Sequence, residues 1–164
     1  MHRRLARPAG GLRRGWAVKA LVVALLTAGV NLTAMSPLAA GTCTIVGDNG
    51  NNTLTGTPNH DVICGRAGDD AETGEGTADT VRGGRGNDYL SGDAGDDLLR
   101  GHEGNDTLVG GGGADNLRGG SGDDKLFAID GATHDTLDGG TGEDYCFGNQ
   151  GDAFVACEHI IKPD

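Results

Sequence analysis

An apolar residue recurs at every ninth position along the middle of the chain, with glycine and aspartate at fixed distances from it. From residue 83 to 127 the sequence reads GGRGNDYLS, GDAGDDLLR, GHEGNDTLV, GGGGADNLR and GGSGDDKLF, which are five nine-residue units in one register. Glycine occupies positions 1 and 4 of every unit, aspartate position 6 and leucine position 8. Self-similarity at a fixed period predicts a solenoid built from one small structural unit.

The same register continues on both sides of this stretch. Four looser units cover residues 47–82, where Glu72 stands at the apolar position 8. After Phe127 comes an eleven-residue unit, read as a nonad with two extra residues around Ala132 and Thr133, and the regular pattern then returns at 139–147. The expected organisation is a short lead-in strand followed by the repeats and a closing cap, at residues 41–46, 47–147 and 148–164.

Positions 7 to 9 of each unit predict a three-residue strand that directs its middle side chain inward. Glycines at positions 1 and 4 suit the tight reversal that must follow, since glycine adopts positive φ and allows close backbone approach. Successive strands would lie on alternate sides of a flattened coil, so that residue i stacks over residue i+18 at about 4.8 Å. The predicted fold is all-β, a parallel β-roll (a right-handed β-solenoid) with two nonapeptides per turn.

The first forty residues read as a cleavable secretory signal peptide. Six basic residues precede an eleven-residue apolar run, Ala20 to Val30, which is too short to span a bilayer as an anchor. Leu38-Ala39-Ala40 suits cleavage after Ala40. Arg13-Arg14 leaves twin-arginine export open beside the general secretory route. The expected location is extracellular.

Beyond residue 40 the chain has seven Lys and Arg against 24 Asp and Glu, which leaves a formal charge of −17. Such a field repels nucleic acid and anionic membranes and attracts cations. We therefore expect no nucleic-acid partner and no membrane insertion. The composition alone is typical of a disordered tail, and the repeat restricts that expectation to the metal-free chain.

Four cysteines lie near the two ends of the repeats, and an even count in an exported chain favours disulfides over a zinc site. Three pairings are formally possible. Their placement favours Cys43–Cys64 and Cys146–Cys157, each of which would staple one end of the array.

The proposed coil stacks the position-6 carboxylates into two columns. Carboxylates repeated every few ångströms repel one another unless cations lie between them. Oxygen ligands in flexible turns favour Ca²⁺ over Mg²⁺, and the lack of His or Cys clusters argues against zinc or copper. The candidate ligands are Asp61, Asp70, Asp79, Asp88, Asp97, Asp106, Asp115, Asp124, Asp135 and Asp144. The neighbouring position-5 residues Asp69, Asp96 and Asp123 are expected to be solvated rather than ligating.

The unit resembles the Gly-Gly-x-Gly-x-Asp-x-(apolar)-x repeat of the RTX (repeats-in-toxin) family, also called hemolysin-type calcium-binding repeats. The resemblance covers roughly Gly47 to Phe147. It implies a roll with several Ca²⁺ ions held between stacked turns by the position-6 aspartates and by backbone carbonyls. The implied carbonyl ligands are those of Gly84, Gly86, Gly95, Gly104, Gly111, Gly113, Gly120 and Gly122.

Many RTX toxins and proteases instead use an uncleaved C-terminal export signal and carry a catalytic or pore-forming region. No such region is expected here, so the resemblance implies calcium binding and fold rather than toxicity or proteolysis. No Ser/His/Asp arrangement is present, and we expect no enzyme activity. The predicted function is a secreted calcium-binding repeat protein that folds on binding calcium. The alternative is an extracellular adhesion or polysaccharide-binding module that displays a flat face of the roll.

Overall fold

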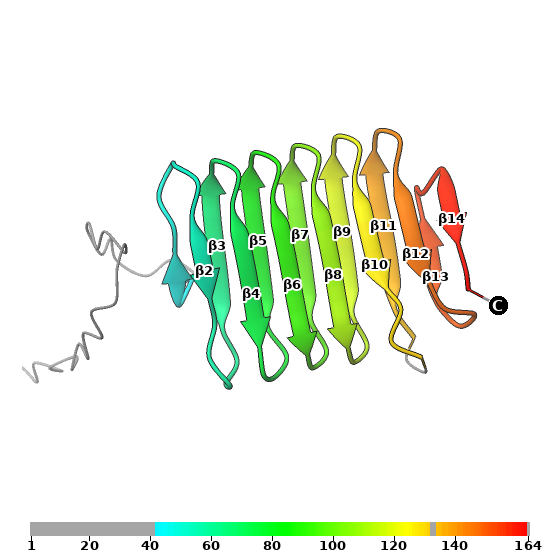
Figure 1. Ribbon diagram of the computed structural model, residues 1–164, viewed down its shortest axis with the longest axis horizontal. Coiled ribbons are helices and arrows are strands. Elements are labelled where there is room, and N and C mark those ends of the chain that lie inside the picture. Colours follow the sequence, from blue (N-terminus) through cyan, green and yellow to red (C-terminus); the bar gives the residue numbers. More distant parts are fainter. Residues whose placement is uncertain (1–41, 132–133, 164) are drawn as a thin grey trace, which may run out of the picture. The chain divides into compact units, whose positions relative to one another are not determined.

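A computed structural model describes residues 42–131 and 134–163. These residues form fourteen strands in two seven-stranded sheets, which lie face to face (Figure 1). Every odd-numbered strand belongs to one sheet and every even-numbered strand to the other, so the chain crosses between the sheets after each strand. The signal peptide predicted for residues 1–40 lies outside the described residues.

The odd sheet contains β1 (Ile45–Val46), β3 (Val62–Ala67), β5 (Thr80–Arg85), β7 (Leu98–Glu103), β9 (Asn116–Ser121), β11 (Thr136–Thr141) and β13 (Ala153–Val155). The even sheet contains β2 (Thr53–Thr55), β4 (Ala71–Glu75), β6 (Tyr89–Ala94), β8 (Thr107–Gly112), β10 (Lys125–Ala128), β12 (Tyr145–Gly148) and β14 (His159–Ile161). In the part of the chain that the structure describes, no helix is long and apolar enough to cross a membrane.

All strand pairs are parallel, and their register follows the repeat. Leu90 pairs with Leu108, eighteen residues further on, and the same offset holds throughout the central strands. Between β9 and β11 the offset grows to twenty, as Leu117 pairs with Leu137. The longer offset agrees with two extra residues in the unit after Phe127, although Ala132 and Thr133 themselves lie outside the described residues. The predicted parallel β-roll is confirmed.

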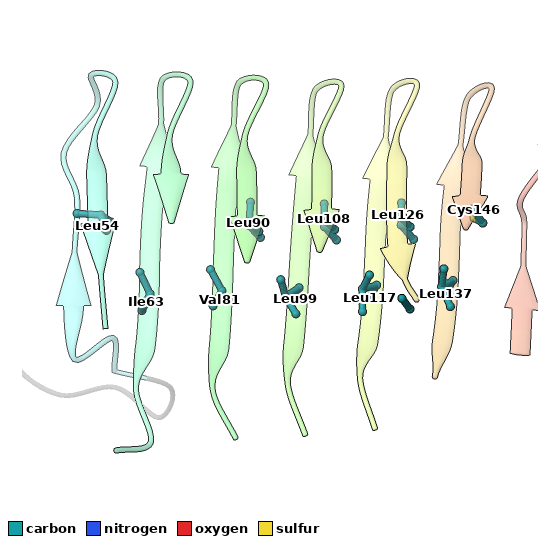
Figure 2. Close-up of a cluster of buried hydrophobic side chains, with 11 residues drawn as sticks. Leu54, Ile63, Val81, Leu90, Leu99, Leu108, Leu117, Leu126, Leu137 and Cys146 are labelled. Atoms are coloured by element: carbon teal, nitrogen blue, oxygen red, sulfur yellow. The ribbon is translucent and has the colours of Figure 1, made fainter. Parts of the chain in front are cut away.

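The core is a single layer of inward side chains from position 8 of each unit, and the side chains of the two sheets alternate along it (Figure 2). From Ile63 to Cys146 these apolar side chains are fully buried. One member of this layer is charged: Glu72 stands in β4 between Leu54 and Leu90 and is also fully buried. Each sheet therefore contributes one layer of side chains to the core.

The strands are longer than the sequence predicted. Seven of the fourteen described strands contain six residues, from position 7 to position 3 of the next unit, rather than three. Position 1 continues the strand without positive φ, and positive φ occurs instead at positions 2 and 4, as at Gly84 and Gly86. The expectation that the position-1 glycine supplies positive φ is therefore wrong. Glycine is needed there for space, because a Cβ on Gly101 would meet the side chain of Asp106.

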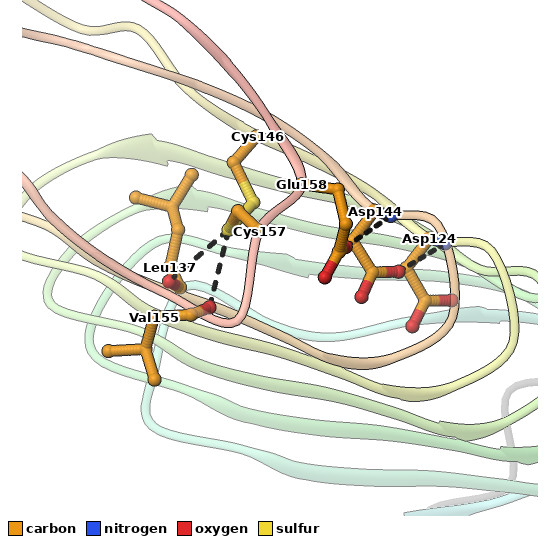
Figure 3. The surroundings of a disulfide bond; sticks show 7 residues. All are labelled: Asp124, Leu137, Asp144, Cys146, Val155, Cys157 and Glu158. Atoms are coloured by element: carbon orange, nitrogen blue, oxygen red, sulfur yellow. Dashed lines mark hydrogen bonds between the residues drawn. A yellow bond between two sulfur atoms is a disulfide. The ribbon is translucent and has the colours of Figure 1, made fainter.

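Two disulfides join the predicted cysteine pairs. Cys43 bonds to Cys64 in β3, with Cα atoms 5.9 Å apart, and Cys146 in β12 bonds to Cys157, with Cα atoms 6.0 Å apart. Figure 3 shows the second bond beside the last coils of the roll. Each bridge links neighbouring coils at one end, where a solenoid has the fewest stabilising neighbours. A loop closed in this way stabilises the fold by about 3 kcal/mol.

Candidate metal centre

The position-6 aspartates form the two predicted columns, one along each edge of the roll. We call them the even column, whose members precede the even strands, and the odd column, whose members precede the odd strands. The even column contains Asp70, Asp88, Asp106, Asp124 and Asp144, and the odd column contains Asp61, Asp79, Asp97, Asp115 and Asp135. All ten side chains are buried, with at most 6% of their surface exposed.

One carboxylate oxygen of each aspartate accepts a hydrogen bond from the preceding coil. The amide of Asp88 donates to Oδ1 of Asp106 at 2.8 Å, and the amide of Asp106 donates to Oδ1 of Asp124 at 2.8 Å. The odd column repeats this arrangement, for example from Asp79 to Asp97 at 2.7 Å. These bonds hold each aspartate side chain against the turn of the neighbouring coil. They do not involve the second carboxylate oxygen, Oδ2.

In nine of the ten aspartates Oδ2 is buried and has no hydrogen-bond partner among the described residues. They are Asp70, Asp79, Asp88, Asp97, Asp106, Asp115, Asp124, Asp135 and Asp144. A buried carboxylate oxygen without a partner is strongly unfavourable. The same unfavourable arrangement repeated along two columns favours a positively charged partner that the described polypeptide does not supply.

Eight of these oxygens lie beside the position-1 glycine of their own unit, and in six of the eight a backbone carbonyl of the next coil points to the same place. A Cβ built on Gly101 would lie less than 3.0 Å from Oδ2 of Asp106 and 2.7 Å from the carbonyl oxygen of Gly119. The same pair of oxygens meets a Cβ at Gly65 and Gly92. Carboxylate and carbonyl oxygens from neighbouring coils therefore converge, and these are the ligands that calcium prefers.

A comparison with protein-family models matches the RTX calcium-binding nonapeptide repeat in four copies, over residues 44–71, 73–108, 100–133 and 127–155. The chain belongs to this family. Its repeats are calcium-binding repeats, and the protein is an RTX-type calcium-binding repeat protein. No characterised protein and no solved structure gave a significant match to the chain.

The RTX columns do not bring three acidic side chains to one point. Within residues 42–131 and 134–163, no group of three or more His, Cys, Asp or Glu side chains is arranged to hold one metal ion. Calcium takes six to eight oxygen ligands. In this roll each ion would therefore draw on one or two carboxylates, with backbone carbonyls and water completing the shell. The residues fit calcium in this way and offer no nitrogen or sulfur ligand set.

The carbonyls implied by the resemblance lie in the turns, at positions 2 and 4. Five of these carbonyl oxygens point at the backbone of the following coil, where an added Cβ would meet them. These five belong to Gly86, Gly95, Gly104, Gly120 and Gly122, while Gly84, Gly111 and Gly113 occupy equivalent positions in their own units. Their role as ligands stays a prediction. The position-1 carbonyls beside Oδ2, such as those of Gly83 and Gly119, were not in the predicted set.

Burial raises the pKa of nearly every aspartate in the columns. It raises the pKa of Asp97 and Asp124 to about 7 and the pKa of Asp106 and Asp115 to about 6. The amide hydrogen bond that each of these carboxylates accepts acts in the opposite direction and lowers the pKa. Neighbouring carboxylates in the columns add to the rise. Without a cation these side chains resist ionisation, and a cation beside Oδ2 favours the charged form.

Asp61 differs from the other nine. Its Oδ1 accepts from the hydroxyl of Thr44 at 2.9 Å, and its Oδ2 accepts from the amide and the hydroxyl of Thr57 at 2.7 and 2.8 Å. Burial acts to raise the pKa of Asp61, but these hydrogen bonds outweigh it and hold the pKa below its ordinary value. Its carboxylate is satisfied by the protein, so Asp61 has the weakest need for a metal.

Glu72 lies in the core rather than in a column. Both of its carboxylate oxygens are buried without a hydrogen-bond partner in the described part of the chain. Burial, together with the nearby charges of Asp88 and Asp70, raises the pKa of Glu72 to about 8. The side chain is therefore largely neutral at pH 7, and the core tolerates it in its protonated form.

Two acidic residues that complete the columns were not among the predicted ligands. The odd column ends at Asp152, whose Oδ1 accepts from the amide of Asp135 at 3.1 Å. The even column ends at Glu158, whose Oε2 accepts from the amide of Asp144 at 2.9 Å (Figure 3). Asp152 sits one place out of register and Glu158 lies beyond the repeats, so the nine-residue period gave no signal for either.

The position-5 side chains form a second ladder beside the even column, and it runs in the opposite direction. Asp69 Oδ1 accepts from the amide of Asn87 at 2.8 Å, and Asp123 Oδ1 accepts from the amide of Glu143 at 3.0 Å. Asp96 does the same beside the odd column, for Ala114. These side chains are exposed and hold the next turn by a hydrogen bond, which is a more specific role than the solvation that we expected.

Proposed function

We propose that the protein is a secreted, extracellular calcium-binding module whose roll folds when several Ca²⁺ ions occupy the two carboxylate columns. One observation carries the proposal: nine buried aspartate oxygens have no partner among the described residues, and six of them lie beside a carbonyl oxygen of the next coil. Bound Ca²⁺ would supply the positive charge that offsets the carboxylates. The aspartates and turn carbonyls of the chain would position that charge between coils.

Repulsion within the columns opposes folding of the metal-free chain. The described residues bury eleven aspartates and Glu72 at close spacing, and the core is only one side chain deep. A ligand that binds the folded chain alone adds its binding free energy to stability. Extracellular modules bind calcium at about 10⁻⁴ to 10⁻³ M. The roll would therefore be folded outside the cell and unfolded at cytosolic calcium concentrations.

Circular dichroism of residues 41–164 during a Ca²⁺ titration, with Mg²⁺ as the control ion, tests this proposal. We expect a cooperative transition from coil to β-structure with Ca²⁺ and little change with Mg²⁺, because Mg²⁺ requires a tighter octahedron and retains its water. Asp106→Ala should raise the calcium midpoint more than Asp69→Ala, since Asp106 has an unpartnered oxygen and Asp69 is exposed. β-Structure that persists in a chelator, or equal effects of the two substitutions, would contradict the proposal.

Export through a cleavable signal is supported by the sequence of residues 1–40 and by two disulfides, which persist in oxidising compartments. N-terminal sequencing of the protein recovered from the medium of expressing bacteria should begin at Gly41. Recovery of an intact Met1 terminus in the cytoplasm would contradict secretion. We propose a binding role without catalysis, since the buried carboxylates serve as ligands in this scheme.

A further inference from the structure

The positive charge of the roll is concentrated on one sheet. Residues 42–163 contain seven Lys and Arg residues. Lys125 in β10 belongs to the even sheet, and Lys162 follows β14. The other five lie on strands of the odd sheet: Arg66, Arg82, Arg85, Arg100 and Arg118. In a chain as acidic as this one, such a distribution calls for an explanation.

Three of these arginines form a column. Arg82 pairs with Arg100, and Arg100 pairs with Arg118, on adjacent strands about 4.8 Å apart. Like charges directly opposite one another destabilise a sheet. The repeat does not require arginine here, because the same position in the even sheet holds Ser91 and Val109. The arginine column is thus not a consequence of the repeat.

Two members of the column have no acidic partner. Arg118 pairs with Asp138 at 3.2 Å. Neither Arg82 nor Arg100 forms an ion pair in the described part of the chain, and both are half-buried. Arg100 and Arg118 also line a shallow hollow together with His102. The uncompensated charge is therefore held against the sheet rather than extended into solvent, which suits an anion lying on the sheet.

Basic and acidic residues are also separated between the two sheets at position 2 of the units. Most regular units have glycine there, but Arg66 and His102 on the odd sheet have φ of 91° and 85°. Glu75 and Asp93 occupy the same position on the even sheet, with φ of 81° and 69°. A non-glycine residue in this region is strained by about 1 to 2 kcal/mol. Basic residues on one face and acidic residues on the other are retained despite that strain.

We propose that the outer face of the odd sheet binds an extended acidic polysaccharide, whose carboxylate or sulfate groups lie along Arg82, Arg100 and Arg118. The polymer would run along the axis of the roll, across the strands. Planar guanidinium groups suit carboxylate and sulfate oxygens because they donate two parallel hydrogen bonds. A regular column of such groups at the strand spacing matches a ligand that repeats its charge along a chain.

Other polyanions fit this face less well. Single-stranded nucleic acid is bound by basic grooves with aromatic side chains for base stacking, and Tyr89, Phe127 and Phe147 lie on strands of the even sheet instead. A flat anionic membrane would also meet the exposed acidic side chains of Asp69, Asp96 and Asp123 at the turns. A single narrow chain along the arginine column avoids those turns.

Isothermal titration calorimetry of residues 41–164 in saturating Ca²⁺ and 150 mM salt, with dextran sulfate as the probe and neutral dextran as its control, tests the proposal. The double variant Arg82→Gln/Arg100→Gln should bind dextran sulfate about tenfold more weakly. The matched variant Lys125→Gln/Lys162→Gln removes the same charge elsewhere and should change binding less than twofold. Circular dichroism of both variants should show the calcium transition of the parent chain.

Equal loss in the two variants would overturn the site, since net charge alone would then explain the binding. Absence of dextran sulfate binding by the parent chain, or equal binding of neutral dextran, would overturn it as well. Tighter binding of a single-stranded oligonucleotide or of phosphatidylserine vesicles through the same arginines would also overturn the proposal. A dimer of the parent chain that the arginine variant abolishes would overturn it too. The polysaccharide inference requires that the roll is folded, but not that its folding depends on calcium. Dextran sulfate binding in a chelator would therefore contradict only the proposal of calcium-dependent folding.

Discussion

The central coils and the first four units follow the same register, but two of the first four units treat their position-6 side chain differently. Residues 83–127 leave one buried oxygen of each position-6 aspartate without a partner among the described residues. In the first units Asn52 stands in place of one aspartate, and Asp61 is satisfied by the hydroxyls of Thr44 and Thr57. The register of eighteen residues is unchanged from one region to the other.

The comparison shows that the fold and the metal sites place separate demands on the repeat. The fold needs an inward side chain at position 8, room at position 1 and an acceptor at position 6 for the amide of the coil before. Asn52 uses its side chain within its own unit instead, where its Oδ1 accepts from the amide of Asp48 at 2.8 Å. A metal site further needs a carboxylate oxygen that the protein leaves unbonded, and only the later units provide it regularly.

The largest effect should come from Glu72→Leu, which gives the first units the core residue of the centre. Burial raises the pKa of Glu72 to about 8 from 4.5. The folded state therefore holds this proton more tightly than the unfolded state, and stability is lost as pH rises from about 4.5 through 8. The variant should be more stable than the parent chain by about 3 to 5 kcal/mol at pH 9, and by much less at pH 4.

Urea unfolding of the calcium-loaded proteins at both pH values measures this difference. The reverse substitution, Leu90→Glu, places the same group on the neighbouring strand and should destabilise the roll by a similar amount. A Glu72→Leu variant that loses calcium affinity would instead show that Glu72 contacts a metal ion, and a gain independent of pH would show that its ionisation is unimportant.

A smaller effect is expected from Asp97→Asn and Asp61→Asn, which remove one charge each from the odd column. Asp97 has an unpartnered oxygen and Asp61 does not. Asp97→Asn should therefore raise the calcium concentration at half-folding at least tenfold, about 1.4 kcal/mol, whereas Asp61→Asn should change it less than twofold. The calcium titration followed by circular dichroism measures both. Equal shifts would remove the distinction between the two regions.

The smallest effect concerns the strained position 2, where the two regions should respond alike. Glu75 and Asp93 are paired neighbours in the even sheet, and both have positive φ. Replacing either with glycine relieves the strain but adds freedom to the unfolded chain. We expect each variant to gain about 0.5 to 1 kcal/mol in thermal unfolding. A loss of stability in the Asp93 variant would mean that the hydrogen bond its Oδ1 accepts from the Ser91 hydroxyl, at 2.6 Å, is worth more than the strain.

The sequence was sufficient for the roll, its register, both disulfides and the two columns, because each follows from a period of nine and from the reach of the side chains. It did not predict how far the strands extend, since a glycine continues a strand as readily as it forms a turn. The closing acids Asp152 and Glu158 fall outside the period. The arginine column is visible only once eighteen-residue neighbours are placed side by side, because its members are separated by a whole turn of the coil.

The two ladders along the even edge also bear on how the roll can be assembled. At position 6 the earlier coil donates its amide and the later coil supplies the carboxylate, as from Asp88 to Asp106. At position 5 the later coil donates and the earlier coil accepts, as from Asn87 to Asp69. Each coil therefore closes on the one before it through a reciprocal pair of bonds. Coils can be added one at a time in the order of synthesis, so the N-terminal part need not wait for the C-terminal residues before it takes its final form.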